Sequence, residues 1–286
     1  MVASKHGEPQ KMIALGQMPW SRISALAIDD LLCPDPRIQI SMPHNKESDM
    51  RFPDRTRAGQ LLAEKLSHYA NRKDVAVVAL PPGGVPVGYE IANALNAPFD
   101  VLVIRHLCVP ENPLLLMGAV SADGTHILNH EVIRWLNIRD ETIDKAIAKE
   151  SVESRRLDKL YRGGAPHLKV VDKVVILVDD GISTFSNFRM AVSLLRLRRA
   201  AQIVIAVPIA GAASVLELLA TVNDVVTCTL RTIPGELDTG QWYEDCQRVS
   251  QESVRDLYER AKRSFGKVGT REPKPEHNRP AKRPRR

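Results

Sequence analysis

Residues 174–189 read VVILVDDGISTFSNFR, and they decide the fold because they pass from a buried strand through two acids and a polar loop into a helix. Five consecutive apolar and mostly β-branched residues are typical of a central parallel strand that is covered on both faces. The helix is indicated by apolar residues at i, i+3, i+4 and i+7, namely Phe188, Ala191, Val192 and Leu195. Asp179 and Asp180 therefore stand at the carboxyl end of a strand, where open α/β sheets bind ligands.

The two acids and the loop after them suit a phosphorylated sugar. Carboxylates accept hydrogen bonds from sugar hydroxyls and hold Mg²⁺ directly or through water. Free N–H groups at the start of a helix bind phosphate. The alternative interpretation is an acidic strand end that caps an ordinary helix.

This stretch resembles the phosphoribosyl-diphosphate-binding motif of type I phosphoribosyltransferases. That motif runs through an apolar strand, two acids, a glycine and a Thr-Gly-x-Thr-like loop that leads into a helix. Asp179, Asp180, Gly181 and Thr184 match it. Phe185 stands where the motif has Gly, and Asn187 where it usually has Thr.

Four further stretches resemble the stand-alone bacterial phosphoribosyltransferase-domain proteins, and together they span roughly residues 52–260. The matching residues are Phe52, Asp54, Arg55, Ala58, Gly59, Leu62 and Ala63; residues 80–87, with Pro82 in place of Arg; Asn112, Pro113, Met117, Gly118 and Ala119; and Trp242, Tyr243, Asp245 and Gln247. Because the four motifs follow one another in the family's order, a generic α/β domain is the less favoured alternative.

The resemblance implies a role for each group of residues. The two acids would hold the ribose hydroxyls and Mg²⁺, and the loop after them would bind the 5-phosphate. Diphosphate would lie in the loop of residues 81–84, where glycines permit close backbone approach, and against Arg105. The candidate catalytic residues are thus Asp179, Asp180 and Arg105, and the candidate binding residues are Pro82, Gly83, Gly84, Gly181, Ser183, Thr184, Phe185, Ser186 and Asn187.

Structural explanations stay open for several of these residues. Arg105 could pair with a surface acid, and Gly83 and Gly84 could form only a turn. Trp242 and Tyr243 could pack in the core rather than stack on a base or fix a flap. No role is expected for the histidines at 106, 126, 130 and 167, which have no ligand spacing.

From about residue 52 strands alternate with helices, which predicts an α/β fold with a mostly parallel sheet flanked by helices and a small hood or flap. Between His106 and Met117, two prolines and three leucines indicate an irregular, mobile flap, and the resemblance implies that it closes over the site. Asp54 is expected to cap the first helix. Type I phosphoribosyltransferases often hold the corresponding loop peptide in the cis form, so the resemblance implies a cis Pro81–Pro82 peptide, which costs only about 0.5–1 kcal/mol at an X–Pro bond.

We predict three parts in the chain: a weakly structured extension over residues 1–50, a phosphoribosyltransferase-like domain over 51–263, and a basic, Pro-rich, disordered tail over 264–286. The formal net charge is +6, and residues 267–286 hold eight Lys and Arg against two Glu, so the whole net charge lies there. Such a tail increases solubility or makes weak contact with nucleic acid.

The composition limits the cellular setting. No run approaches eighteen apolar residues and no secretory signal is visible, so a cytoplasmic protein without a membrane span is expected. The four cysteines form no Cys-x-x-Cys pair, which argues against a zinc site and against a disulfide framework; they are Cys33, Cys108, Cys228 and Cys246.

Two functions stay open. The first is a Mg²⁺-dependent enzyme that binds phosphoribosyl diphosphate or a nucleoside monophosphate and transfers 5-phosphoribose to or from a nitrogenous base. The second is a catalytically degenerate nucleotide-sensing protein of the same fold. Pro82, Phe185 and His106, which stands where many type I enzymes have Lys, favour the second because all three changes affect anion contacts. The acceptor base and a homodimeric state are left open.

Overall fold

A six-stranded parallel sheet forms the centre of the protein. The structure is a computed structural model that describes residues 38–40, 51–182, 185–231 and 239–265 of the 286-residue chain. The strand order is β1-β9-β8-β7-β2-β3, and every neighbouring pair is parallel. The strands are β1 Ile38–Ile40, β2 Val75–Ala79, β3 Phe99–Val101, β7 Val174–Val178, β8 Gln202–Gly211 and β9 Asp224–Arg231. The predicted α/β class is confirmed.

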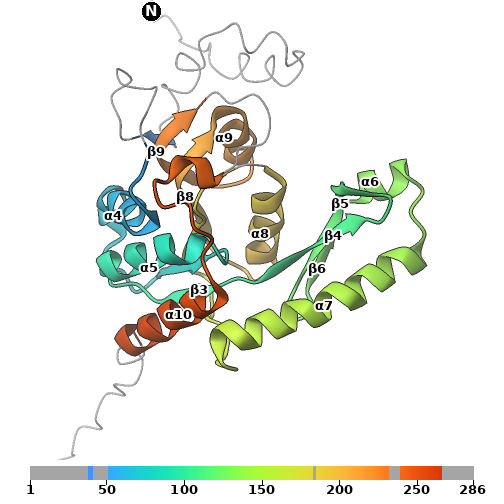
Figure 1. Ribbon diagram of the computed structural model, residues 1–286, viewed down its shortest axis with the longest axis horizontal. Coiled ribbons are helices and arrows are strands. Elements are labelled where there is room, and N and C mark those ends of the chain that lie inside the picture. The colour runs from blue at the N-terminus through green and yellow to red at the C-terminus, as the bar shows by residue number, and fades with distance from the viewer. Residues whose placement is uncertain (1–37, 41–50, 183–184, 232–238, 266–286) are drawn as a thin grey trace, which may run out of the picture.

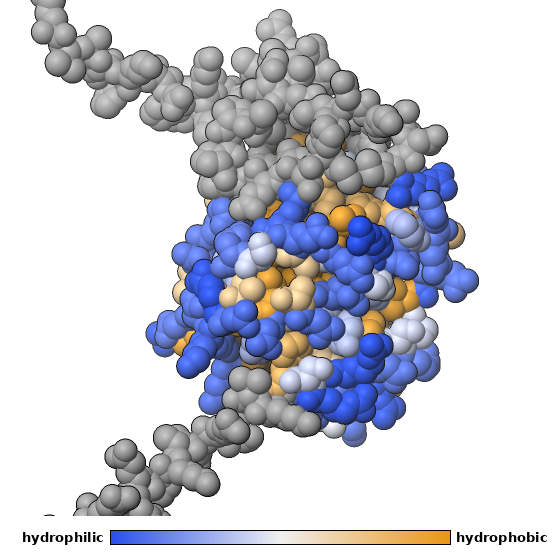
Figure 2. Space-filling model, turned by 90° about the vertical axis from the view of Figure 1, so that its left-hand side faces the viewer, coloured by the Kyte–Doolittle hydropathy of each residue, from blue (hydrophilic) through white to orange (hydrophobic). Residues whose placement is uncertain are grey.

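Helices cover both faces of this sheet (Figure 1). One face packs on α4 Arg55–Lys65, α5 Gly84–Leu95 and α10 Gln251–Phe265, and the other on α8 Phe185–Leu197 and α9 Ala212–Leu219. Alternate residues of β7 enter the two cores, so all five of its side chains are buried and must be apolar. Seen from the side of α4, α5 and α10, the described surface is mostly hydrophilic, as expected for amphipathic helices (Figure 2).

A second, antiparallel sheet forms a hood beside the main sheet. Its strands are β4 Ile104–Val109, β5 Asn112–Ser121 and β6 His126–Leu128, and it is followed by α6 His130–Trp135 and the long α7 Asp140–Arg162. Leu107, Val109 and Met117 of the hood pack with Ile143 of α7 in a small core of their own. In Figure 1 α7 runs from the hood back to the main domain.

The expectation of an irregular flap between His106 and Met117 was wrong. This stretch is most of the β4–β5 hairpin, in which Cys108 pairs with Leu116 and Val109 with Asn112. Residues 113–115 therefore fall between paired positions, where the ladder needs no N–H donor and a proline is tolerated.

Several local predictions are confirmed. The Asp54 side chain caps α4 by accepting from the N–H of Arg57 at 2.7 Å. The Pro81–Pro82 peptide is cis. The three-part division of the chain stays a prediction, although β1 lies in the stretch expected to be an extension and pairs with β9 at the sheet edge. Among the helices that the structure describes, none has the length and apolar character needed to cross a membrane.

Candidate functional site

The two candidate loops meet where the strand order changes direction. From β2 the chain adds β3 on one side, and β7, β8 and β9 then follow on the other. The loops after β2 and β7 therefore leave the sheet side by side, and the N–H of Leu80 donates to the carbonyl of Val178 at 2.9 Å. Ligands of open α/β sheets bind at such a switch point.

Gly83 and Gly84 bring the first loop onto the two acids. A Cβ atom at Gly83 would lie 2.3–2.7 Å from the carboxylate atoms of Asp180. At Gly84 it would lie 2.6 Å from the carbonyl oxygen of Val178 and 2.7 Å from the Cα of Asp179. Neither position accepts a side chain without movement of the backbone or of the acids, so these glycines do more than form a turn.

Asp180 is held by residues from both ends of the domain. Arg55 donates from Nε to Oδ2 of Asp180 at 2.8 Å and from Nη1 to the carbonyl of Gln247 at 3.0 Å. The Arg55 guanidinium lies over the Tyr243 ring, 4.7 Å from its centroid, and the Tyr243 hydroxyl donates to the carbonyl of Asp180 at 2.7 Å. We call Arg55, Tyr243 and Gln247 the Arg55 clamp.

The acids sit in an environment that disfavours a second negative charge. Burial and the Asp180 carboxylate raise the pKa of Asp179 well above its ordinary value. Oδ1 of Asp179 accepts the N–H of Asp180 at 2.9 Å. Burial also raises the pKa of Tyr243, so its hydroxyl keeps the proton that it donates. A bound cation or hydroxyl donors would stabilise the charged form of the pair.

The structure brings together part of the predicted set. Gly83 and Gly84 lie against Asp180 and Asp179, Pro82 precedes them in the same loop, and Gly181 directly follows the acids. The N-terminus of α8 comes next, with Phe185, Ser186 and Asn187 in its first turn. Ser183 and Thr184 lie outside the described residues.

Arg105 is not placed against the acids. Its Nε donates to Oε2 of Glu150 on α7 at 2.9 Å. The structure thus shows the alternative in which Arg105 pairs with an acid. Leu107 and Val109 of the same strand pack against α7 as well. Burial, and next the Arg105 charge, lower the pKa of His106, so the neutral imidazole is favoured there.

Arg55 contacts the acid pair although the sequence analysis gave it no site role, and Tyr243, for which a site role was left open, contacts it too. Both belong to the matched motifs, which was the available signal, but their partner Asp180 is remote in the chain. Tyr243 is buried, with its ring 5.8 Å from that of Phe52, as the core interpretation expects. Stacking on a base or fixing a flap stays a prediction. The Trp242 carbonyl accepts the N–H of Phe52 at 2.8 Å.

Comparisons with known proteins agree with this architecture. The chain is 36% identical over 218 residues to "Putative phosphoribosyl transferase Rv0571c" and to "Putative phosphoribosyl transferase MT0597", from two strains of Mycobacterium tuberculosis. These matches cover 76% of this chain and 48% of each relative, so the chain spans about half the length of the curated relatives it matches. The solved structure of TT1426 from Thermus thermophilus is similar with a TM-score of 0.64 and 31% identity, over 73% of this chain and 98% of that one. No protein-family model matches the chain.

Proposed function

Because the chain belongs to the type I phosphoribosyltransferase family, we propose that it binds phosphoribosyl diphosphate or a nucleoside monophosphate and transfers 5-phosphoribose to or from a nitrogenous base. The observation that carries this proposal is the contact between the 81–84 loop and the acid pair at the switch point of the sheet. This contact places carboxylates that can bind a sugar next to a loop whose backbone an anion can approach closely.

Each part of the ligand has a matching element. The acid pair of Asp179 and Asp180 forms the ribose end of the site, and residues 181–187, the last three of which begin α8, take the 5-phosphate at a helix N-terminus. The leaving diphosphate lies against the loop of residues 81–84. The hood covers the ribose and the base and excludes water.

The reaction exchanges one bond at C1 of the ribose for another. The bond from C1 to the diphosphate oxygen breaks, and its electron pair leaves with diphosphate. The lone pair of a ring nitrogen of the base forms the new C1–N bond, and the base gives up a proton. The acid pair contributes electrostatically, because negative charge near the ribose stabilises the developing positive charge at C1.

The residues present fit a role for Mg²⁺. The acids offer carboxylate oxygens, which Mg²⁺ prefers, but Oδ2 of Asp180 is already bound to Arg55. In the parts of the chain that the structure describes, no three His, Cys, Asp or Glu residues gather as a metal site. Asp179 and Asp180 would thus hold the ion in part or through water, and the ion would neutralise the leaving diphosphate.

A nucleotide sensor without turnover is the second candidate. Two observations favour it: Pro82 has no N–H to offer to diphosphate, and Arg105 is paired with Glu150. Each lost anion contact is worth on the order of 1.5–3 kcal/mol. A cytoplasmic location, a homodimer and weak nucleic-acid contact through residues 267–286 stay predictions.

Two experiments test the proposal. Calorimetry measures binding of phosphoribosyl diphosphate, ribose 5-phosphate and nucleoside monophosphates, with and without Mg²⁺. A second assay measures diphosphate release in the presence of nitrogenous bases. Binding that the Asp179→Asn variant weakens supports the site. Release of diphosphate identifies an enzyme, whereas tight binding without release identifies a sensor. In that case the double change Pro82→Arg with Phe185→Gly is expected to increase affinity for phosphoribosyl diphosphate. The proposal is wrong if the unmodified protein binds none of these ligands.

A further inference from the structure

We propose that Arg55 is a positioning residue: supported by Tyr243, it holds the Asp180 carboxylate in one orientation and leaves Asp179 as the acid that contacts the ribose. This inference rests on the proposed function. It assigns different roles to two acids that the sequence motif presents as equivalent: Asp179 contacts the ribose, and Asp180 is held by Arg55.

The Arg55 side chain is fixed from three directions. Its Nε binds Asp180, its Nη1 binds the Gln247 carbonyl, and its planar face lies on the Tyr243 ring. The Arg55 and Asp180 side chains are only 12% and 11% exposed. A guanidinium held in this way presents its donors in a preset direction, which a lysine at the same place would not do.

Asp180 is enclosed on its remaining sides. Gly83 lies so close to the carboxylate that a Cβ there would overlap it. The Tyr243 hydroxyl holds the Asp180 backbone through its carbonyl. Rotation of this carboxylate toward a ligand would therefore require loss of the Arg55 contact.

Asp179 differs from Asp180 in the respect that matters for a ligand. No arginine or lysine pairs with its carboxylate among the described residues, and its Oδ1 accepts the neighbouring N–H of Asp180. The hydrogen bond of Arg55 is to Asp180, so its positioning effect on a ligand passes through that carboxylate.

A double-mutant cycle on ribose 5-phosphate affinity separates positioning from simple stabilisation. The variants are Arg55→Met, Asp180→Asn and the two combined, with Arg57→Met as the matched control. Arg57 lies on the same helix and is exposed, and its guanidinium donates to the Gln60 side chain at 3.3 Å, away from the acids. Calorimetry gives the affinities for ribose 5-phosphate and for inorganic phosphate, and thermal unfolding monitors folding.

Arg55→Met is expected to weaken ribose 5-phosphate binding about tenfold or more and to leave inorganic phosphate binding unchanged. In the Asp180→Asn background it has no further effect, because the residue through which it acts is already altered. Arg57→Met binds as the unmodified protein does. Arg55→Lys recovers part of the affinity, since it keeps the charge without the second donor.

The positioning role is overturned if Arg55→Met binds ribose 5-phosphate normally, or if its effect adds fully to that of Asp180→Asn. If Arg55→Met does not fold, Arg55→Lys and Tyr243→Phe replace it in the same cycle. Failure of the unmodified protein to bind any ribose phosphate overturns the proposed function, and this inference with it. The two failures are distinguishable: in the first the unmodified protein does not bind, and in the second both it and Arg55→Met bind normally.

Discussion

Gly83 sets the distance between the first loop and Asp180. In a Gly83→Ala variant the added methyl would overlap the carboxylate, so the loop or Asp180 must move and the Arg55 contact is strained. We expect a loss of about 1–3 kcal/mol in the free energy of unfolding, measured by urea denaturation. Gly211→Ala is the control, because the nearest atom to its Cβ is 3.7 Å away. A Gly83→Ala variant as stable as the control would mean that the loop stands farther from the acids.

The sequence predicted half of this residue-scale arrangement. The glycines and acids could be identified because each lies in a short motif at the end of a strand. The Arg55–Asp180 pair could not, since it joins residues 125 apart through side-chain geometry that no local pattern encodes. For Arg105 the sequence suggested a contact with the ligand, but it did not reveal that Arg105 forms an ion pair with Glu150 of α7.

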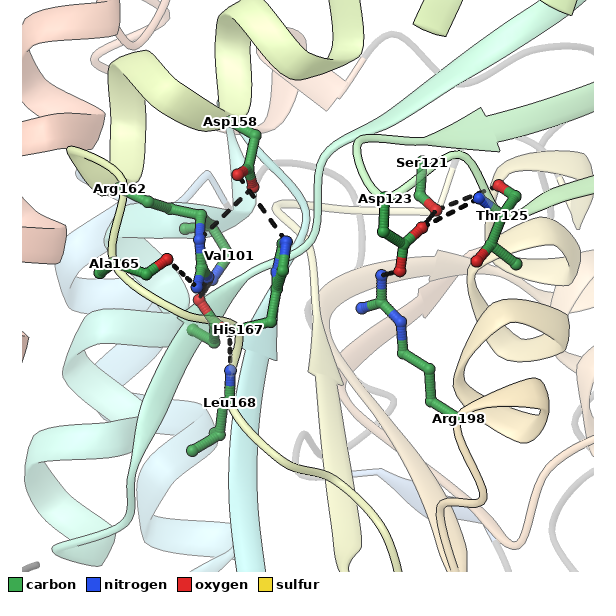
Figure 3. A network of polar contacts seen from close by, with 11 residues as sticks. Val101, Ser121, Asp123, Thr125, Asp158, Arg162, Ala165, His167, Leu168 and Arg198 are labelled. Atoms are coloured by element: carbon green, nitrogen blue, oxygen red, sulfur yellow. Dashed lines mark hydrogen bonds and ion pairs between the residues drawn. The ribbon is translucent and has the colours of Figure 1, made fainter.

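At the scale of elements, α7 is tied to the main sheet by a buried ion pair. Arg162 near its C-terminus binds Asp100 of β3, whose other oxygen accepts the N–H of Leu168 at 2.8 Å. Figure 3 shows Arg162 and Leu168 on either side of this contact. Arg162→Met would leave the Asp100 charge buried without its partner, at a cost of about 3–5 kcal/mol in the free energy of unfolding. Chemical denaturation measures it. Arg156→Met on the exposed side of the same helix should leave the unfolding midpoint unchanged, and equal effects of the two would contradict the prediction.

The turn between β5 and β6 is tied to the end of α8 by a second network. Although burial raises the pKa of Asp123, hydrogen bonds from Ser121 and the Thr125 N–H, together with the Arg198 charge, lower it well below the ordinary value of 3.8 (Figure 3). A depressed pKa stabilises the folded state above pH 3.8, and this contribution is lost as the pH falls below that value.

Asp123→Asn should therefore cost about 1 kcal/mol of stability at pH 7. The difference from the unmodified protein should shrink when urea denaturation is repeated at about pH 3. The exposed Asp144→Asn on α7 serves as the control. A difference that is the same at both pH values would show that the Asp123 charge is not what stabilises the turn.

The elements themselves were largely predictable, and the exception has a physical reason. Strands buried on both faces and helices with one apolar face have periods that can be read from the chain, as in β7 and α8. The β4–β5 hairpin was missed because its pairing is interrupted around residues 113–115, which removes the alternation of a regular strand. Its stability comes from packing on α7, a contact that only the folded structure shows.

At the scale of the whole molecule, the charge distribution predicts a separable tail. The net charge of +6 lies in residues 267–286, which are outside the described residues. Deleting them is expected to leave the melting temperature and ribose 5-phosphate affinity unchanged, and to remove salt-sensitive adsorption to nucleic acid. Thermal unfolding and binding to a nucleic-acid column at two salt concentrations measure this. A large drop in melting temperature would show that the tail packs on the domain.

The two ends of the domain meet at the site. The N–H of Glu244 donates to the carbonyl of Phe52 at 2.8 Å, next to the bridge that pairs Phe52 with Tyr243. A ribosome must therefore have completed residue 247 before both supports of Arg55 exist. A nascent chain stopped at residue 240 would contain all of the described sheet strands, both acids and Arg55, but it would lack Tyr243 and Gln247. The order of synthesis thus delays the full support of Arg55 until every strand of the sheet has been made.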